Sequence, residues 1–265
     1  MTWGDLLQAT TNMTAIIVVR YFAVAATLHG LLWVRRPSRA VRLSRRPPSP
    51  KQLRGEIALS VASSVIYAAP AAFAMQAWKA GGTRLYSDLS PPAWAGMAAS
   101  ALAYLLLHDA FYYWAHRAMH WRPVFKALHA GHHKHVEPSP FAGFAFDPLE
   151  ALLTGWFLPA LVFVIPMEVH LAVVLLLVMT VTGTINHCGW EVWPRRWVEG
   201  AFGRWIVIPA HHSQHHGRFG CNFGLYFQHW DRWMGTNAEA VSHPAWRRST
   251  AVAPGLEARA EAPVA

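Results

Sequence analysis

The chain has 265 residues, of which 54% are hydrophobic and only 14% are charged, and its net charge is +9. Soluble domains usually carry about 25% charged residues, so this deficit indicates a membrane protein, although the length alone would permit one or two soluble domains. The two cysteines, Cys188 and Cys221, form no CxxC pair, which argues against a disulfide framework or a zinc ribbon. Most of the positive charge lies beside an apolar segment, where an anionic membrane surface attracts it, so nucleic acid is not an expected partner.

The first predicted transmembrane span covers residues 13–34, because about 20 apolar residues are needed to cross a bilayer. Arg20 and His29 interrupt this span, and Arg20 is expected to lie near its outer end and to snorkel toward water. Residues 1–12 contain no Lys or Arg and do contain Asp5, so a cleaved signal peptide is not expected.

Residues 35–54 are predicted to form a cytoplasmic loop. They contain eight basic residues, no acidic residue and four prolines, and proline disfavours regular structure. Cytoplasmic loops of membrane proteins carry an excess of Lys and Arg. The basic residues of this loop are Arg35, Arg36, Arg39, Arg42, Arg45, Arg46, Lys51 and Arg54.

Two further spans are predicted at residues 57–78 and 92–107, and the second of these continues as a helix into the first histidine cluster. Residues 149–187 are apolar and contain two internal prolines, which predicts a hairpin of two short spans. If the basic loop is cytoplasmic, all the histidine clusters emerge in the cytoplasm. The loop 79–91 and the turn near Pro166 then face the opposite side.

The remaining segments lie beyond this hairpin. Residues 188–235 are mixed and aromatic, which predicts a cytoplasmic cap. Residues 237–265 are predicted to form a disordered tail, because residues 247–265 are rich in Ala, Pro and Arg. Residues 1–236 are expected to form a single membrane-embedded domain.

Sixteen histidines are the most unusual feature of the composition, and eleven of them fall into tight clusters. Neutral imidazole offers a lone pair near pH 7, which makes histidine the commonest metal ligand. The first cluster contains His108, His116 and His120, which fall within an arc of roughly 120° on one helix. His116 and His120 are four residues apart, so both can reach one metal ion.

The second cluster has the pattern HxxHH. Its members are His129, His132 and His133, which would share about 100° of one helix face. His135 falls off that face, so we expect it to be a bystander.

The third cluster repeats the HxxHH pattern with His212, His215 and His216. His211 lies outside their arc and is expected to be a second bystander. His187 stands alone at the end of the predicted hairpin.

The number of imidazoles indicates two metal ions. One zinc ion is satisfied by four ligands, and nine or ten histidines exceed any single coordination sphere. Imidazole suits zinc, copper, iron and nickel, so the ligands alone do not select the metal. A site that faces apolar spans predicts an apolar substrate. Oxidation of an unactivated C–H bond requires iron or copper and not redox-inert zinc.

These motifs together resemble the fatty-acid hydroxylase/sterol desaturase superfamily. The family run HDxxYYWxHRxxH is matched by His108–His120, and its HxxHH run is matched by His129–His133. Its late segment, Pro-x-x-HxxHH followed by Asn-x-Gly, is matched by Pro209–His216 and Asn222–Gly224. The closing WDRxxGT run is matched by Trp230–Thr236.

The resemblance covers about residues 56–236, and Ser139–Leu153 with the INHCGWEVWP run is most like the sterol C-5 desaturase branch. It implies an all-α integral membrane fold with about four transmembrane helices and a cytosolic helical cap. It further implies two iron ions, O2 as oxidant, and an external electron donor such as a ferredoxin or a b-type cytochrome with its reductase. The location implied is a bacterial inner membrane, or the endoplasmic reticulum in a eukaryote. The implied metal ligands are His108, His116, His120, His129, His132, His133, His187, His212, His215 and His216.

The expected reaction is hydroxylation or desaturation of a lipid, sterol-like or fatty-acyl. The chain departs from the family pattern in having NFG where NYG is usual and in the extra His211, and neither change removes a ligand. A membrane metal transporter or metal buffer is the alternative, and it would place its ligands at the bilayer midplane. A zinc hydrolase usually needs a glutamate base near the metal, and the sequence contains no HExxH motif.

Overall fold

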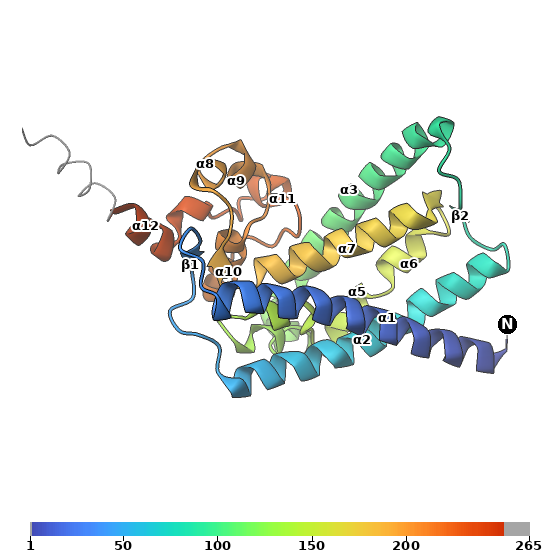
Figure 1. The fold of residues 1–265 in the computed structure, drawn as a ribbon, viewed down its shortest axis with the longest axis horizontal. Coiled ribbons are helices and arrows are strands. Elements are labelled where there is room, and N and C mark those ends of the chain that lie inside the picture. Colours follow the sequence, from blue (N-terminus) through green and yellow to red (C-terminus); the bar gives the residue numbers. More distant parts are fainter. Residues whose placement is uncertain (1, 252–265) are drawn as a thin grey trace, which may run out of the picture.

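Long helices form the body of the protein, and short helices form a cap at one end of it (Figure 1). The computed structural model describes residues 2–251. Within them, the long helices are α1 (Trp3–His29, continued to Val34 by the π-helix η1, Gly30–Val34), α2 (Pro50–Lys79), α3 (Trp94–Met119) and α7 (Val169–Asn186). The prediction of a mostly helical chain is therefore confirmed.

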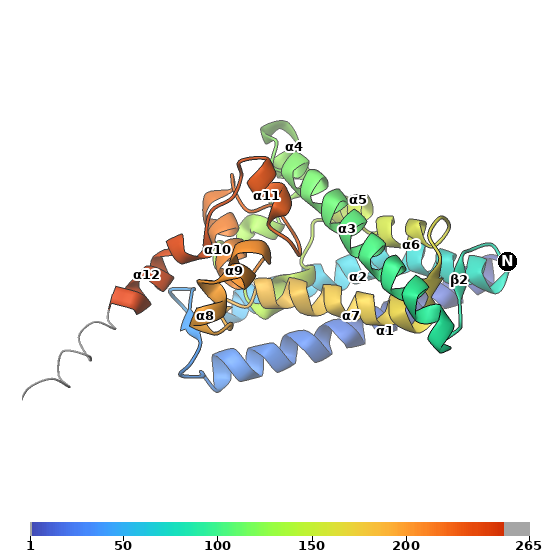
Figure 2. The same cartoon turned by 90° about the horizontal axis from the view of Figure 1, so that it is seen from above.

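Shorter elements connect the long helices and build the cap (Figure 2). Between α2 and α7 lie η2 (Pro91–Ala93), α4 (Arg122–Leu128), η3 (His132–Lys134), η4 (Pro140–Phe144), α5 (Pro148–Thr154) and α6 (Phe157–Leu161). After α7 come α8 (Arg195–Val198), α9 (Ala201–Trp205), α10 (Pro209–Arg218), α11 (His229–Trp233), η5 (Ala240–Ser242) and α12 (Pro244–Ala251).

Three helices of the described chain are long and apolar enough to cross a membrane: Trp3–Val34, Pro50–Lys79 and Val169–Asn186. The helix α3 is not among them, since His108 and Asp109 introduce polar groups into its apolar stretch. These three helices support a membrane protein, and the count of four spans stays a prediction.

Residues 149–187 do run to the far end and return, but the predicted helix of the first half is wrong. This half forms the two short helices α5 and α6, and only the second half forms a long helix, α7. The break follows from Gly155, where the ring of Tyr67 occupies the position that a Cβ atom would take. Pro159 also has no N–H to donate to the carbonyl of Gly155, so the helix is interrupted before it.

Two short strand pairs mark the opposite ends of the bundle. At the cap end, β1 (Val41–Arg42) pairs antiparallel with β4 (Trp190–Glu191), so the basic loop lies beside the segment that follows α7. At the far end, β2 (Leu85–Tyr86) pairs parallel with β3 (Met167–Glu168). The loop after α2 and the turn near Pro166 therefore lie together, as the alternation of spans predicts.

The short helix η4 is held between α1, α2 and α7. The hydroxyls of Tyr21 and Ser60 both donate to the carbonyl of Phe141, at 2.9 and 2.8 Å. A Cβ atom on Gly143 would lie 2.9 Å from Cα of Thr184, so α7 approaches η4 as closely as only glycine permits. This packing fixes the wall of the cavity described below.

The C-terminal segment corrects a second expectation. A disordered tail from residue 237 is wrong for residues 237–251, which contain η5 and α12. Ala240, Ala245 and Trp246 are buried in one cluster with Leu43 and Ile208, so this segment closes the cap. The remainder of the predicted tail, residues 252–265, lies outside the described residues.

The arrangement of the two ends predicts opposite membrane faces for three exposed positions. Arg46→Cys and Lys134→Cys lie at the cap end, and Ser87→Cys lies at the far end. Cys221→Ser provides the background, because Cys188 is fully buried and should not react. A membrane-impermeant thiol reagent should label the first two positions from one face and the third only from the other. Labelling of Arg46→Cys and Ser87→Cys from the same face would contradict this topology.

Candidate metal centre

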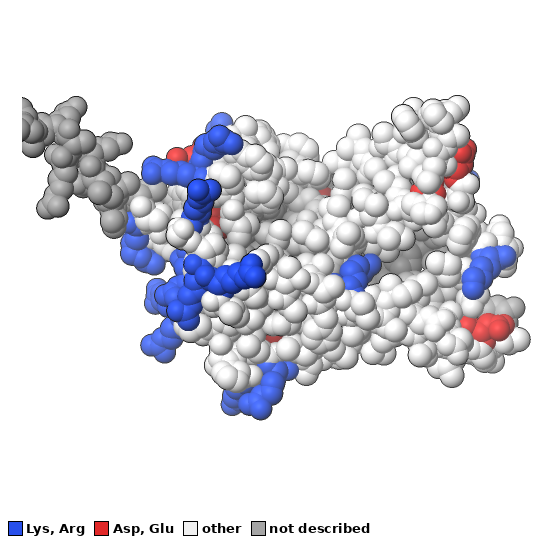
Figure 3. All heavy atoms as spheres, in the orientation of Figure 1, with Lys and Arg blue, Asp and Glu red and all other residues white. Residues whose placement is uncertain are grey.

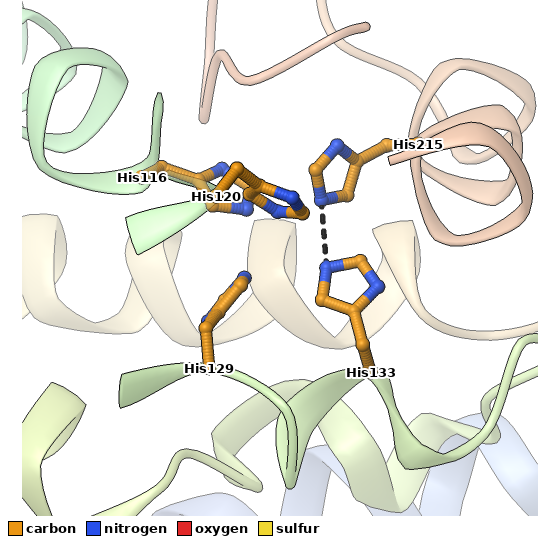
Figure 4. Close-up of side chains that lie close together, drawn as sticks. All are labelled: His116, His120, His129, His133 and His215. Carbon is orange, nitrogen blue, oxygen red and sulfur yellow. Dashed lines mark hydrogen bonds between the residues drawn. The ribbon is translucent and has the colours of Figure 1, made fainter. Parts of the chain in front are cut away.

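Nine of the ten predicted ligands converge in two neighbouring groups of imidazoles. Within each group, one nitrogen from every ring lies within 4.8 Å of those of the others. Figure 4 shows the rings of the first group turned toward a common centre. The first group is His116, His120, His129, His133 and His215. The second group is His132, His187, His212 and His216.

Helix spacing explains how α3 and α10 contribute to these groups. His116 lies in the last turn of α3 and His120 caps that helix, so their rings lie on one face with centroids 5.2 Å apart. On α10, His212 and His216 are four residues apart and both join the second group. His215 joins the first group, so α10 lies between the two and supplies both.

The HxxHH segment at residues 129–133 does not form one helix face, and that prediction is wrong. The helix α4 ends at Leu128, and His132 lies in the separate turn η3. The cause is Gly131, whose N–H donates to the carboxylate of Asp147 at 2.6 Å, while that carboxylate fills the place of a Cβ atom. The resulting turn sends His129 to the first group and His132 to the second.

The spacing of the nitrogens fits ligands of a shared metal ion. In the second group, the Nε2 atoms of His132 and His187 are 3.2 Å apart. Those of His187 and His212 are 2.8 Å apart, and those of His212 and His216 are 3.1 Å apart. Adjacent ligands of one ion with metal–nitrogen bonds of about 2.1 Å are separated by about 3 Å. In the first group, the Nε2 atoms of His133 and His215 are 3.0 Å apart (Figure 4).

Hydrogen bonds to the protein leave one nitrogen of several rings free for a metal. The Nδ1 atom of His116 lies 2.9 Å from the carbonyl of Phe223, and that of His129 lies 2.8 Å from Glu150. A carbonyl can only accept, so His116 donates from Nδ1 and presents a lone pair on Nε2. The Nε2 atoms of His116, His120 and His129 are buried and have no hydrogen-bond partner in the described chain.

Burial keeps these imidazoles neutral. Removal from water lowers the pKa of His120 and of His132 to about 4. Burial also holds the pKa of His215 well below its ordinary value, and the neighbouring His120 lowers it further. A neutral imidazole has the lone pair that a metal requires, so the residues fit a pair of metal ions. Neither Cys188 nor Cys221 belongs to either group within the described residues.

Three clustered histidines lie outside both groups. His108 is the one predicted ligand that does not join them, because its Nδ1 lies 3.0 Å from the hydroxyl of Tyr226 and its ring stacks on Phe157. His211 is buried, and its Nδ1 accepts from the N–H of Ile208 at 3.3 Å. His135 also lies outside both groups of the described chain, and the bystander role of His135 and His211 stays a prediction.

Sequence reasoning missed the acidic residues that position the site. Glu150 is buried, and its carboxylate lies 2.8 Å from Nδ1 of His129. In the sequence it is only one residue of the Ser139–Leu153 run that resembles the sterol C-5 desaturase branch. Asp231 accepts the N–H groups of Phe223 and Gly224 at 2.9 and 2.8 Å, which fixes the segment whose carbonyl orients His116. The WDRxxGT motif contains Asp231, but the motif alone does not show which backbone groups its carboxylate binds.

An apolar cavity of about 350 Å³ extends from the middle of the helix bundle to the second group. Its walls come from α1, α2, α7 and η4, and His187 and His212 line its inner end. His108 and Tyr112 of α3 also line it. Such a volume is in the range of about 300–1,000 Å³ found for small-molecule sites.

With this site and fold in view, comparison with known proteins assigns the class. The chain belongs to the fatty acid hydroxylase family, whose sequence profile matches residues 101–236. The resemblance to the sterol desaturase branch is also confirmed. No solved structure matches the chain.

The names of three similar proteins describe enzymes that act on sterols. The chain is 32% identical over 157 residues to the Delta(7)-sterol 5(6)-desaturase ERG3B of Gibberella zeae, covering 59% of this chain and 47% of that protein. It is 34% identical over 169 residues to the lathosterol oxidase of Rattus norvegicus, covering 62% and 53%. It is 33% identical over 148 residues to the methylsterol monooxygenase erg25A of Aspergillus fumigatus, covering 54% and 48%. The chain thus spans about half the length of the curated relatives it matches.

Single substitutions should separate ligands from bystanders. His132→Ala and His215→Ala each remove a nitrogen from one group, so each should lose at least one bound metal per chain and all turnover. His135→Ala and His211→Ala should keep the metal and most of the turnover. Metal analysis of the purified variants measures this directly. If His211→Ala lost as much metal as His215→Ala, the grouping described here would be incorrect.

Glu150→Gln should weaken metal binding without removing a ligand. The carboxylate orients His129 through Nδ1, and loss of such a partner typically costs roughly 10–100-fold in metal affinity. Competition with a chelator measures the affinity. Glu199→Gln, on the exposed surface of the cap, is the matched control and should behave as the parent chain. Equal metal affinity in both variants would show that Glu150 has no positioning role.

Proposed function

We propose that the protein is a membrane-bound di-iron oxidoreductase that uses O2 to hydroxylate or desaturate a lipid. The observation that carries this proposal is the apolar cavity that ends on His187 and His212 of the second imidazole group. An apolar channel leading to a metal centre suits a substrate that has no polar handle at its reacting carbon. Similarity to sterol desaturases and a methylsterol monooxygenase supports a sterol-like substrate, and a fatty-acyl lipid is the other candidate.

Two iron ions would be held by the two groups, His116, His120, His129, His133 and His215 on one side and His132, His187, His212 and His216 on the other. Bound iron would supply O2 activation and the oxidation of a C–H bond. His108, the tenth ligand implied by the family, stays a candidate that the geometry does not favour. Its hydrogen bond with Tyr226 instead supports a role in the cavity wall.

The protein's own residues hold the imidazoles in position and exclude water from the site. Backbone carbonyls fix His116, His132 and His215 through their Nδ1 atoms, at 2.9, 3.1 and 2.8 Å. Neutral, preorganised imidazoles require no proton release when iron binds. The apolar walls keep water away from the reacting carbon, which protects reactive species from side reactions. Substrate placement within these walls determines whether an alcohol or an alkene results.

We further propose that α1, α2, α3 and α7 are four spans, that α5 and α6 carry the chain from the cap end back to the far end, and that the cap is cytosolic. Basic side chains gather at the cap end, as Figure 3 shows, and the loop after α1 supplies several of them. An excess of Lys and Arg favours the cytoplasmic side. The same basic end suits an acidic electron donor, a ferredoxin or a b-type cytochrome with its reductase. The membrane is a bacterial inner membrane or the endoplasmic reticulum.

A metal transporter or metal buffer is the competing function. Transport sites typically lie near the bilayer midplane, between repeats and broken helices. Here the imidazoles lie at the cap end of the bundle, beside β4 and the loop after α4, and the continuous α7 ends just before His187. This position favours the oxygenase.

The oxygenase proposal predicts iron-dependent oxidation of a lipid. Purified protein loaded with iron should hold about two iron ions per chain and, given a reductant and lipid extract, should consume O2. Mass spectrometry should then find a lipid that has gained one oxygen atom, labelled from heavy-isotope O2, or has lost two hydrogen atoms. The His132→Ala variant is the control for adventitious oxidation. Metal flux across vesicles without any lipid oxidation would contradict the proposal and favour the transporter.

A further inference from the structure

Arg20 is a charged side chain in the apolar part of the bundle. It lies near the middle of the helix Trp3–Val34, farther from the outer end than expected. Its side chain lines the cavity and is partly exposed, and its Nε atom is buried. On the face that Figure 3 shows, the middle of the molecule carries one basic patch and almost no other charge. The guanidinium is therefore placed where a charge is least expected.

No partner for this charge is found among residues 2–251. The Nε atom has no hydrogen bond, and Arg20 forms none of the ion pairs in the described chain. The polar residues that line the cavity with it are hydroxyls, an amide and imidazoles, and no Asp or Glu is present in the described lining. Removing a charge from water without a partner is costly, and charged groups inside membrane segments typically mark ligand sites.

Residues of α7 line the cavity between Arg20 and the imidazoles. Its neighbour Tyr21 packs in the same cluster as Met179 of α7. Met179 precedes His187 by eight residues, which is about 12 Å along a helix. Met179, Gly183, Asn186 and His187 all line the cavity, so the space is continuous from Arg20 to the second group.

We propose that Arg20 forms an anion subsite in this cavity, which binds the carboxylate or sulfate of an amphipathic lipid whose apolar body extends to His187 and His212. The apolar walls match the body of such a lipid, and the guanidinium matches its charge. Guanidinium pairs with a planar carboxylate through two parallel hydrogen bonds. A phosphate monoester carries about −1.5 to −2 charges, which one arginine would leave partly unpaired in an apolar space.

This subsite narrows the proposed substrate to a lipid with an acid group. Binding of the acid group does not depend on the proposed function, whereas oxidation at the other end of the lipid does. Arg20 precedes Trp33 by 13 residues, about 20 Å along a helix, and Trp33 donates to the carbonyl of Cys188 beside His187. The oxidised carbon therefore lies many bonds from the acid group. Oxidation at the carbon adjacent to the acid group is therefore not expected.

Lipid binding without turnover tests the subsite. The full-length protein, in nanodiscs of zwitterionic lipid and without reductant, is titrated with a long-chain fatty acid, its methyl ester and the matching alkyl sulfate. A steroid carboxylic acid and its methyl ester form a second pair. At least one anion should bind about tenfold or more tightly than its neutral ester. The anion that binds better, carboxylate or sulfate, identifies the chemistry of the natural group.

Substitutions at Arg20 give the matched comparison. Arg20→Gln should remove the preference for the anion and leave binding of the ester unchanged, while Arg20→Lys should keep most of the preference. Lys79→Gln, an exposed basic residue at the end of α2, should bind as the parent chain does. Retained binding of the neutral ester by Arg20→Gln shows that this variant is folded.

Three results would overturn the subsite. They are equal affinity for acid and ester in the parent chain, an anion preference that survives in Arg20→Gln, or loss of the preference when anionic phospholipid is added to the disc. The last result would mean that the guanidinium faces the bilayer and not the cavity. Because the assay needs no turnover, its failure leaves the oxygenase proposal intact, and absence of oxidation leaves the binding result intact.

Discussion

The rest of the structure depends on two adjoining groups of nine imidazoles, eight of them buried and His120 partly exposed. Several of their nitrogens are removed from water and have no hydrogen-bond partner in the described chain, including Nε2 of His116 and of His129. Unpaired buried polar atoms cost free energy, roughly 1–3 kcal/mol each, so a chain that buries this many needs a compensating ligand. The two metal ions proposed above would provide it, because each free lone pair would become a metal bond.

Backbone carbonyls and carboxylates of the surrounding fold hold these imidazoles in position, and turns of the chain bring them together. The segment after α10 supplies the carbonyl of Phe223 to His116, and Asp231 holds that segment through its backbone N–H groups. Glu150 supports His129 from the opposite side. The long helices then bring an apolar cavity to the second group. The imidazoles, the groups that position them and one end of the cavity thus lie together at the cap end of the bundle.

The sequence predicts most of this site, because helical spacing alone aligns imidazoles on α3 and α10. It fails at residues 129–133, where the Gly131–Asp147 contact breaks the helix, and no local pattern shows that contact. It fails again at α5 and α6, where hydrophobicity predicts a span but the packing of Tyr67 on Gly155 ends the helix. The role of Arg20 depends on a cavity formed by distant segments, which spacing within one helix cannot reveal.

The central claim is that two iron ions lie side by side in shells made of imidazole nitrogen. X-ray absorption and Mössbauer spectroscopy of the iron-loaded protein test it most directly. The account predicts two iron ions per chain, magnetically coupled, with nitrogen and oxygen neighbours only and no sulfur, and a first shell that changes in His132→Ala and not in His211→Ala. A single uncoupled iron in active protein, or an iron–sulfur bond from Cys188 or Cys221, would contradict it.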